Sequence, residues 1–494
     1  MNALPLKHIA ICGAGLAGTL CAATLAHLLP DEIKLSFVDI PGSDETDTFF
    51  GNVTSPAIYD FLLGIGITEP ELLPTTNTAF SLGTQYINWG ANKRSWIQSF
   101  HKPLPIFQGV EFHQYLTRLR RIAPEAKTQN LYTHDRYIMS AHAARGNVFA
   151  HPPEDKKTPL HNMEYGYHFS PKDWCELLSR HLKNSRITKL NGDIRSIERT
   201  EGRISSITLS DGRSVEAELY IDCTGFKSKI CHSKIQSDRH LKAASSFISE
   251  DKTGNICRQL TGTDYGWHSE TSLQNGRQCL TVYDLASEKA ALTAHGKQDI
   301  SPVEATLGRL EQPWQGNCLA IGHSAAVLEP LTPAPMMLLQ RDLERLVELI
   351  PHTENMNVEA REYNRRFTED YSHASIFQRG FFEDESPGKS AYWKAAIIEP
   401  INQKLENKIT QFHSRGTSVQ YDLEPFFKED WIQQHFGMGR TPRRYDSLAD
   451  RANEQQIMQT FSQLRMANEA LAMKMPPYHI YMKKLLEYFR KKNG

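Results

Sequence analysis

The residues most informative about chemistry are three glycines near the start of the chain, spaced as Gly13-x-Gly15-x-x-Gly18. Glycines at this spacing allow a tight turn, let the backbone approach a pyrophosphate closely and let a helix pack on a strand. Asp39 follows at a spacing close to the usual one of about 20 residues for a carboxylate that binds a ribose hydroxyl. The pattern predicts a dinucleotide site with contacts from Gly13, Ala14, Gly15, Leu16, Ala17, Gly18 and Asp39.

The elements that would position these glycines follow in the right order. Residues 8–12 form a short apolar run typical of a buried strand, residues 14–29 are rich in small residues and predict a helix, and residues 34–40 predict a second strand. Together they make a βαβ unit. A secretory signal is the alternative interpretation, but it does not explain the glycines and no clear cleavage site follows. We therefore expect a cytoplasmic protein.

Composition narrows the class of protein. The 494 residues include 56 basic and 57 acidic side chains, for a net charge of −1, which does not favour a nucleic-acid partner. No apolar run reaches the length of about 18 residues that a membrane span needs. The eight cysteines are scattered without a C-x-x-C pair, so they predict buried thiols rather than disulfides or a zinc site. The polar stretch 42–48 predicts a surface loop.

Two later segments can return to the first βαβ unit. Alternating residues in 204–221 predict a hairpin around Asp211-Gly212, which leads into the strand and small-residue turn YIDCTGF, containing Gly225. Residues 316–351 predict a strand, a turn at Gly322, a proline-rich loop and an amphipathic helix. A second glycine turn before a helix favours FAD over NAD. His323 is a candidate base or flavin contact, with a local cap as the alternative.

Several motifs carry a resemblance to a known family. They are GAGLAG, LLGIGITEPELLPTTNTAFSLGTQYINW, YGYHFSPKDWCELLSRHL, YIDCTGFKSKI, GNCLAIGHSAAVLEPL, FGMGRTPRRYD and MPPYH. In this order along nearly the whole chain they resemble the flavin-dependent tryptophan halogenases, a branch of the FAD-dependent monooxygenases. The resemblance implies FAD reduced by a separate flavin reductase, a C4a-hydroperoxide attacked by halide, and a pocket lysine that relays the halogen. It adds Thr54, Pro330 and Leu331 to the cofactor contacts.

The chain departs from the family pattern at four places. Ser81 stands where the family has its lysine, and a hydroxyl cannot replace an ammonium group. Of the motif W-x-W-x-I-P only Trp267 remains, followed by His268. After Glu329-Pro330-Leu331 the family's acid, serine and threonine are replaced, which leaves fewer donors for a halide. The acid of G-E-A-T-x-P is also missing. The expected pocket residues are Trp267, His268, Thr332, Pro333 and Ala334, and the catalytic candidates are Ser81, His323 and Glu329, the last either an acid or a loop cap.

These observations predict an α/β fold: a Rossmann-like FAD-binding domain of the glutathione-reductase/aromatic-hydroxylase type with an interleaved substrate lobe and a mainly helical C-terminal region. We expect the FAD-binding domain in 1–350, from segments of about 1–60, 165–235 and 310–350, with the lobe in about 61–164 and 236–309, and helices in 351–494. The aromatic residues of the C-terminal region are expected either to line the substrate pocket or to form a helical core. These residues are Trp393, Phe426, Phe427, Trp431 and Phe436.

The predicted function is an FAD-dependent monooxygenase or hydroxylase acting on an aromatic, indole-like compound or on tryptophan in a partner protein. Authentic halogenation with an unusual active site and flavin binding without oxygen-activating turnover are the alternatives. Expected partners are the aromatic substrate and a flavin reductase, without nucleic acid, membrane or metal, and a homodimer is left open.

Overall fold

The computed structural model describes residues 6–122, 133–154, 157–183, 186–231, 235, 239–250, 254–296, 301–383, 390–397 and 401–493. The chain divides into two compact units, each built from three separated segments. Unit 1 comprises residues 1–78, 169–245 and 297–372, and unit 2 comprises residues 79–168, 246–296 and 373–494. The division differs from the expected one, because the helices after residue 373 belong with the predicted lobe and do not form a region of their own.

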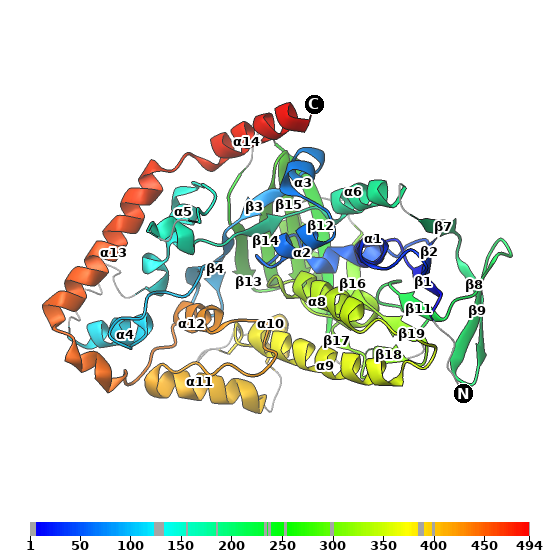
Figure 1. The fold of residues 1–494 in the computed structure, drawn as a ribbon. Coiled ribbons are helices and arrows are strands. Elements are labelled where there is room, and N and C mark those ends of the chain that lie inside the picture. The colour runs from blue at the N-terminus through cyan, green and yellow to red at the C-terminus, as the bar shows by residue number, and fades with distance from the viewer. Residues whose placement is uncertain are drawn as a thin grey trace. The chain divides into compact units, whose positions relative to one another are not determined.

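Unit 1 is built on a six-stranded sheet in the order β18-β19-β11-β1-β2-β7 (Figure 1). Strand β1 pairs in parallel with β2 on one side and with β11 on the other, and β11 pairs in parallel with β19. The predicted βαβ unit and both returning segments therefore lie side by side. The sheet strands are β1 (His8–Cys12), β2 (Lys34–Asp39), β7 (Ile187–Asn191), β11 (Leu219–Asp222), β18 (Trp314–Gln315) and β19 (Cys318–Ala320).

Helices and smaller sheets complete unit 1. The predicted hairpin forms, with β9 paired to β10, and β8 adds a third strand. The first helix, α1, packs against α6 and α8. The bounds are α1 (Leu16–Leu28), α2 (Ile58–Gly64), α3 (Glu69–Thr75), α6 (Pro171–Lys183), α8 (Ala334–Glu348), β8 (Ile194–Thr200), β9 (Arg203–Leu209), β10 (Ser214–Val215), β16 (Val303–Thr306), β17 (Gly308–Arg309), β20 (Ala326–Val327) and the 3-10 helices η1 (Glu45–Phe50) and η6 (Gly322–Ser324).

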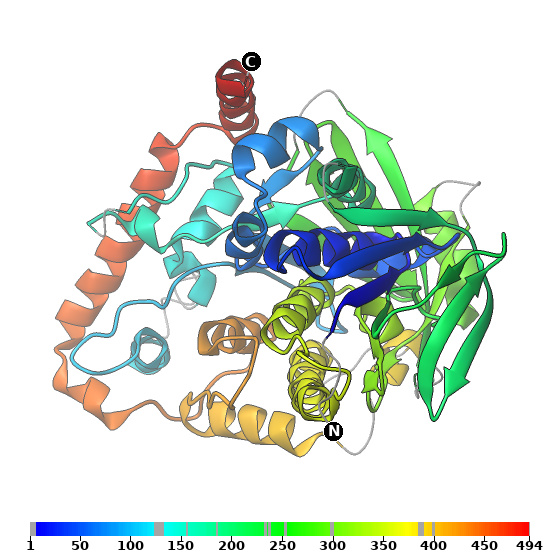
Figure 2. The same ribbon diagram turned by 45° about the vertical axis from the view of Figure 1, so that its right-hand side comes forward.

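Unit 2 contains most of a larger sheet, in which β15-β14-β13-β4-β5 are neighbours. Its strands are β3 (Ala79–Ser81), β4 (Gly83–Trp89), β5 (Arg94–Ser99), β6 (Gly166–His168), β13 (Arg258–Thr263), β14 (Gly266–Leu273) and β15 (Gly276–Tyr283). Its helices are α4 (Phe112–Ile122), α5 (Met139–Gly146), α7 (Glu288–His295), α10 (Ala391–Ala395), α11 (Gln403–Arg415), α12 (Lys428–Gly437), α13 (Glu454–Lys474) and α14 (Tyr478–Asn493), the last two drawn in orange to red in Figure 2. Strand β12 (His240–Ser249) and helix α9 (Asn357–Arg379) run through the boundaries of both units.

The C-terminal helices belong to unit 2 because they share its core and its hydrogen bonds. Gln433 of α12 exchanges hydrogen bonds with the backbone of Ser99 in β5, and Asn468 of α13 donates to the carbonyl of Tyr137. Phe461 of α13 stacks on Phe112 at 4.4 Å between ring centroids. Contacts of this kind between distant segments cannot be read from the periodicity of one helix.

Candidate functional site

The glycine turn after β1 is packed so closely that side chains are excluded. Gly13 has φ +110°, and a Cβ atom there would lie 2.3 Å from the carbonyl oxygen of Cys223, at the end of β11. A Cβ at Gly18 would lie 1.7 Å from the carbonyl oxygen of Gly13. The first and third glycines are therefore required by the turn and by the packing of α1 on the strands.

The N-terminus of α1 already binds two oxygen atoms of the chain. The N–H of Ala14 donates to Ser43 Oγ at 2.8 Å, and the N–H of Leu16 donates to Asp47 Oδ2 at 2.9 Å. Ser43 and Asp47 are buried, so the prediction that 42–48 forms a surface loop is wrong at these positions. The reason is that both side chains satisfy backbone N–H groups that a helix N-terminus leaves without partners.

The electrostatics of this turn depend on Asp47. Burial raises the pKa of its carboxyl to about 8, although the hydrogen bond from Leu16 opposes this shift. In the unfolded chain an aspartate titrates near pH 4. Asp47 therefore holds its proton more tightly when the chain is folded, and its contribution to the free energy of unfolding falls as the pH rises from about 4 to about 8.

Three other predicted cofactor residues, Gly225, Gly322 and Pro330, lie close to α1 or to η1 and the glycine that follows it. A Cβ at Gly322 would lie 2.8 Å from Cβ of Ala17, and a Cβ at Gly225 would lie 2.7 Å from Cγ2 of Thr46, in η1. Pro330 lies beside Gly51, which directly follows η1. Asp39 ends β2 with an exposed side chain, and Thr54 is buried. Segments far apart in the sequence thus meet around residues 43–51.

Asp222, which the sequence analysis missed, holds the two returning segments together. Its buried Oδ1 accepts hydrogen bonds from the N–H and hydroxyl of Thr224 and from the hydroxyl of Ser324, which also accepts from the N–H of Gly225. Its Oδ2 accepts from the hydroxyl of Ser228 at 2.6 Å. The carboxylate therefore fixes the YIDCTGF turn against η6. The sequence signal that could have identified Asp222 is its position at the end of the YIDCTGF strand, directly before the small-residue turn.

His323 lies in η6, where its ring is buried and stacks on Phe50 at 3.9 Å between centroids. Burial lowers the pKa of His323 to about 3, so the imidazole is neutral near pH 7 and is a poor general base. Its Nδ1 lies 3.5 Å from the carbonyl oxygen of Ala326, and its buried Nε2 has no hydrogen-bond partner among the described residues. A neutral ring with one unsatisfied nitrogen fits a contact to a bound ligand better than proton abstraction.

The loop after η6 is organised by its own side chains. Glu329 is buried and forms an ion pair with Arg239, with 2.8 Å between Oε2 and Nη2. The structure therefore supports a structural role for Glu329, the alternative to an acid. The hydroxyl of Thr332 accepts from the N–H of Ala334 at 3.3 Å, where α8 begins, and Pro333 precedes that helix.

The remaining candidates lie in unit 2. Ser81 in β3 is fully buried, and its hydroxyl bonds only weakly with the backbone of Gly83, at 3.3 and 3.5 Å. Trp267 in β14 is also fully buried, with the Arg258 guanidinium 5.1 Å from its ring centroid. His268 is partly exposed and points to the opposite face of β14, because neighbouring residues in a strand alternate. The prediction that Trp267 and His268 line one pocket is wrong for this reason.

The C-terminal aromatics are mostly core residues. Trp393 donates its indole N–H to the carbonyl of Thr263, and Phe426 stacks on Phe377 at 3.8 Å between centroids. Trp431 is fully buried, whereas Phe427 is exposed. A cavity of about 240 Å³ in unit 2 is lined largely by charged and polar side chains, among them Arg94, Glu383, His413 and Arg440, and by none of the five predicted aromatics. The burial of most of these aromatics fits the helical core, and a role in the substrate pocket stays a prediction.

The residues of unit 1 fit a dinucleotide. The turn supplies backbone N–H groups at the positive end of a 13-residue helix, and no acidic residue lies in the first turn of that helix. The buried His323 Nε2 has no hydrogen-bond partner within the part of the chain that the structure describes. Gly13, Gly15 and Gly18 would hold the pyrophosphate, Asp39 the ribose, and η6 the flavin ring. Ser43 and Asp47, bound to two of the same N–H groups, are the side chains such a ligand would meet.

A sequence profile of the tryptophan halogenase family matches residues 8–454. The chain belongs to the tryptophan halogenase family. Tryptophan 7-halogenase KtzQ of Kutzneria sp. (strain 744) is 21% identical, with 97% of this chain and 98% of that protein aligned. Tryptophan 6-halogenase ThaL of Streptomyces albogriseolus is also 21% identical, over 89% of this chain and 90% of that protein.

Solved structures give the same fold. BrvH, a flavin-dependent halogenase from Brevundimonas sp. BAL3, superimposes with a TM-score of 0.88 at 23% identity, covering 97% of this chain and 99% of that one. Xcc4156, a flavin-dependent halogenase from Xanthomonas campestris, gives a TM-score of 0.86 at 23% identity, covering 97% and 98%. The predicted fold class and family are confirmed, and the expected FAD agrees with the names of these structures. Among the described residues, no helix is long and apolar enough to cross a membrane.

We expect the carboxyl of Asp47 to make cofactor binding sensitive to pH. Deprotonation above its pKa of about 8 puts a negative charge at N–H groups that a pyrophosphate would use. We expect the Kd for FAD to rise at least about tenfold between about pH 6 and about pH 9, because tenfold corresponds to only about 1.4 kcal/mol of repulsion. In Asp47→Asn the affinity should be higher and nearly independent of pH. Fluorescence titration of FAD measures both.

The matched control for this prediction is Asp44→Asn, which removes an exposed carboxylate three residues earlier. FAD binding should remain dependent on pH in this variant, with the midpoint moved to a lower pH, because the charge of Asp44 helps to raise the pKa of Asp47. If Asp47→Asn and Asp44→Asn gave the same pH profile, the carboxyl of Asp47 would not control the site.

Proposed function

We propose that this protein is an FAD-dependent enzyme that uses O2 to oxidise an aromatic, indole-like substrate, and that it transfers oxygen rather than halogen. Membership in the tryptophan halogenase family supports the flavin and the aromatic substrate, because the curated relatives are named as tryptophan halogenases and the solved relatives as flavin-dependent halogenases. Oxygen transfer rests on one observation, the buried Ser81 hydroxyl at the position where the resemblance puts a lysine.

The chain's own residues would position and shield the reaction. Reduced FAD supplies the activation of O2 when it is bound. The glycine turn and Asp39 would orient the cofactor, while neutral His323 would hydrogen-bond to it without taking a proton at pH 7. Ser81 offers a hydroxyl that bonds weakly to the backbone of Gly83 at the start of β4, and Pro333 and Ala334 offer no side-chain donors to an anion. Oxygen transfer to an electron-rich ring then needs only the exclusion of water and a correctly placed substrate.

Halogenation is the second candidate function, and the names of the relatives favour it. The substrate is either a free indole-like compound or a tryptophan side chain in a partner polypeptide, and the reduced FAD comes from a separate flavin reductase. Whether the protein forms a homodimer, which the sequence leaves open, can be checked by light scattering.

The experiment is aerobic turnover of tryptophan, indole and a tryptophan-containing peptide with a flavin reductase, NADH and FAD, with and without chloride or bromide. We expect products with one added oxygen atom and no dependence on halide. Catalase is included in every reaction, and reactions without this protein control for oxidation by free reduced flavin. Halogenated products would overturn oxygen transfer in favour of the second candidate.

A substrate-independent readout accompanies turnover. Reoxidation of protein-bound reduced FAD by O2, followed in a stopped-flow instrument, should proceed at the same rate with or without halide. A rate that rises with chloride or bromide concentration would show that halide reaches the reacting centre despite Ser81.

A further inference from the structure

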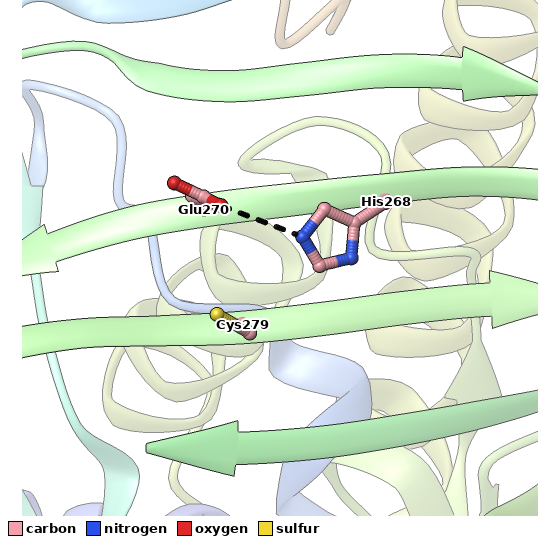
Figure 3. A group of neighbouring side chains, drawn as sticks. All are labelled: His268, Glu270 and Cys279. Atoms are coloured by element: carbon pink, nitrogen blue, oxygen red, sulfur yellow. Dashed lines mark ion pairs between the residues drawn. The ribbon is translucent and has the colours of Figure 1, made fainter. Parts of the chain in front are cut away.

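A cluster of three potential metal ligands lies on the hairpin of β14 and β15, on the face opposite to Trp267. The register of the hairpin places Glu270 directly across from Cys279 and His268 directly across from Thr281. Side chains alternate along a strand, so these residues share one face. Figure 3 shows the His268 ring and the Glu270 carboxylate on one strand, with Cys279 on its neighbour.

The ligand atoms of His268, Glu270 and Cys279 all lie within 4.8 Å of one another. His268 Nε2 is 3.8 Å from Glu270 Oε1. Around a tetrahedral Zn²⁺ with bonds of about 2.0 to 2.3 Å, neighbouring ligand atoms are separated by somewhat less than the 3.8 Å between His268 Nε2 and Glu270 Oε1. Small side-chain rotations therefore bring the three ligand atoms to bonding distance. An imidazole, a carboxylate and a thiolate are the donors that Zn²⁺ takes in proteins.

A chain of hydrogen bonds orients the imidazole toward this cluster. Thr281 Oγ1 lies 2.8 Å from His268 Nδ1 and 2.7 Å from His295 Nδ1, and His295 Nε2 lies 2.9 Å from Ser246 Oγ. Because Nδ1 of His268 is engaged, Nε2 is the nitrogen that faces Glu270. Ring orientation by a partner on the second nitrogen is usual for metal-binding histidines.

The charges around the cluster balance a divalent cation. Glu270 and a deprotonated Cys279 carry two negative charges. Arg277 is a nearby cation that hydrogen-bonds to Cys279 and pairs with Glu250, and its Nε is 3.7 Å from the second oxygen of Glu270, Oε2. The oxygen that faces His268 is therefore left for a metal.

We propose that His268 Nε2, Glu270 Oε1 and Cys279 Sγ bind a divalent metal of the zinc type. Three protein ligands leave a fourth position for water. The site is separate from the glycine turn and does not depend on the function proposed above. It links two neighbouring strands of the unit 2 sheet, and His295 acts as a positioning residue through Thr281.

The test is titration of the metal-free full-length protein with Co²⁺, followed by competition with Zn²⁺. We expect one equivalent to bind with an absorption band from thiolate-to-cobalt charge transfer, and Zn²⁺ to abolish the band. Cys279→Ser should remove the band. His268→Ala and Glu270→Gln, both at partly exposed positions, should weaken Co²⁺ binding strongly, and His295→Ala should weaken it by about 10- to 100-fold.

Cys175→Ser is the matched control, because this half-buried thiol in α6 lies outside the cluster. It should leave the band and the affinity unchanged. Absence of the band in the unaltered protein, or its persistence in Cys279→Ser, would overturn the proposal. Zn²⁺ should also protect Cys279 from alkylation, measured by mass spectrometry, and equal alkylation with and without Zn²⁺ would count against the site.

Discussion

Replacing Gly15 by alanine is expected to weaken FAD binding by about 5- to 150-fold, which corresponds to about 1–3 kcal/mol for inserting a methyl group into a packed site. Gly15 has φ −68° and ψ −175°, an extended conformation that alanine adopts without strain. Its added Cβ would instead lie 2.7 Å from the carbonyl oxygen of Ser43 and 3.0 Å from Asp47 Oδ1. The substitution therefore acts through steric contact of the added Cβ and not through backbone strain. Equilibrium titration with FAD measures the change in Kd.

Two variants show whether the effect is specific to the site. Gly64→Ala, near the end of α2, places a Cβ in open space and should leave the Kd for FAD unchanged. Gly13→Ala combines a positive φ with a clash against Cys223, so it should destabilise unit 1 as well as abolish FAD binding. If Gly15→Ala bound FAD as tightly as Gly64→Ala does, the cofactor would not be held at this turn.

The sequence predicts the parts of the fold whose signals are local. Strand β1 coincides with the expected residues 8–12, and α1 and β2 lie within one or two residues of their predicted bounds. The turn at Gly322 has φ +62°, as its glycine suggested, and α8 follows the proline-rich loop. Glycine spacing and short apolar runs are properties of neighbouring residues, so they can be read without the structure.

What the sequence does not predict depends on partners distant along the chain. In the sequence, Ser43 and Asp47 are ordinary polar residues of a loop. Their role depends on the N–H groups of the first glycine turn, which only the fold brings close to them. Asp222 ends a predictable strand, but its link to Ser324 joins positions about a hundred residues apart. His268 and Cys279 meet only through the register of a hairpin, although the alternation of β14 could have separated His268 from Trp267.

The largest expected effect on stability comes from Lys408 in α11. Its side chain is fully buried, and its ammonium lies 3.0 Å from Oε2 of Glu424 and 4.5 Å from the ring centroid of Trp431. Burial lowers the pKa of Lys408, and Glu424 opposes that shift. Lys408→Met should reduce the free energy of unfolding by about 3–5 kcal/mol, because it leaves the buried carboxylate without its cation. Urea unfolding followed by tryptophan fluorescence measures the loss.

A double variant separates the free-energy cost of an unpaired buried charge from the net contribution of the ion pair to stability. A buried ion pair gains little over well-packed apolar residues, so Lys408→Met combined with Glu424→Leu should recover most of the lost stability. Lys404→Met is the matched control one turn earlier on α11, where the partly exposed ammonium lies 5.6 Å from the ring centroid of Tyr421, and it should cost less than about 1 kcal/mol. Equal losses in Lys408→Met and in the double variant would mean that the lysine stabilises unit 2 through its packing against Trp431, and that the charge of Glu424 is compensated by the indole N–H that it accepts.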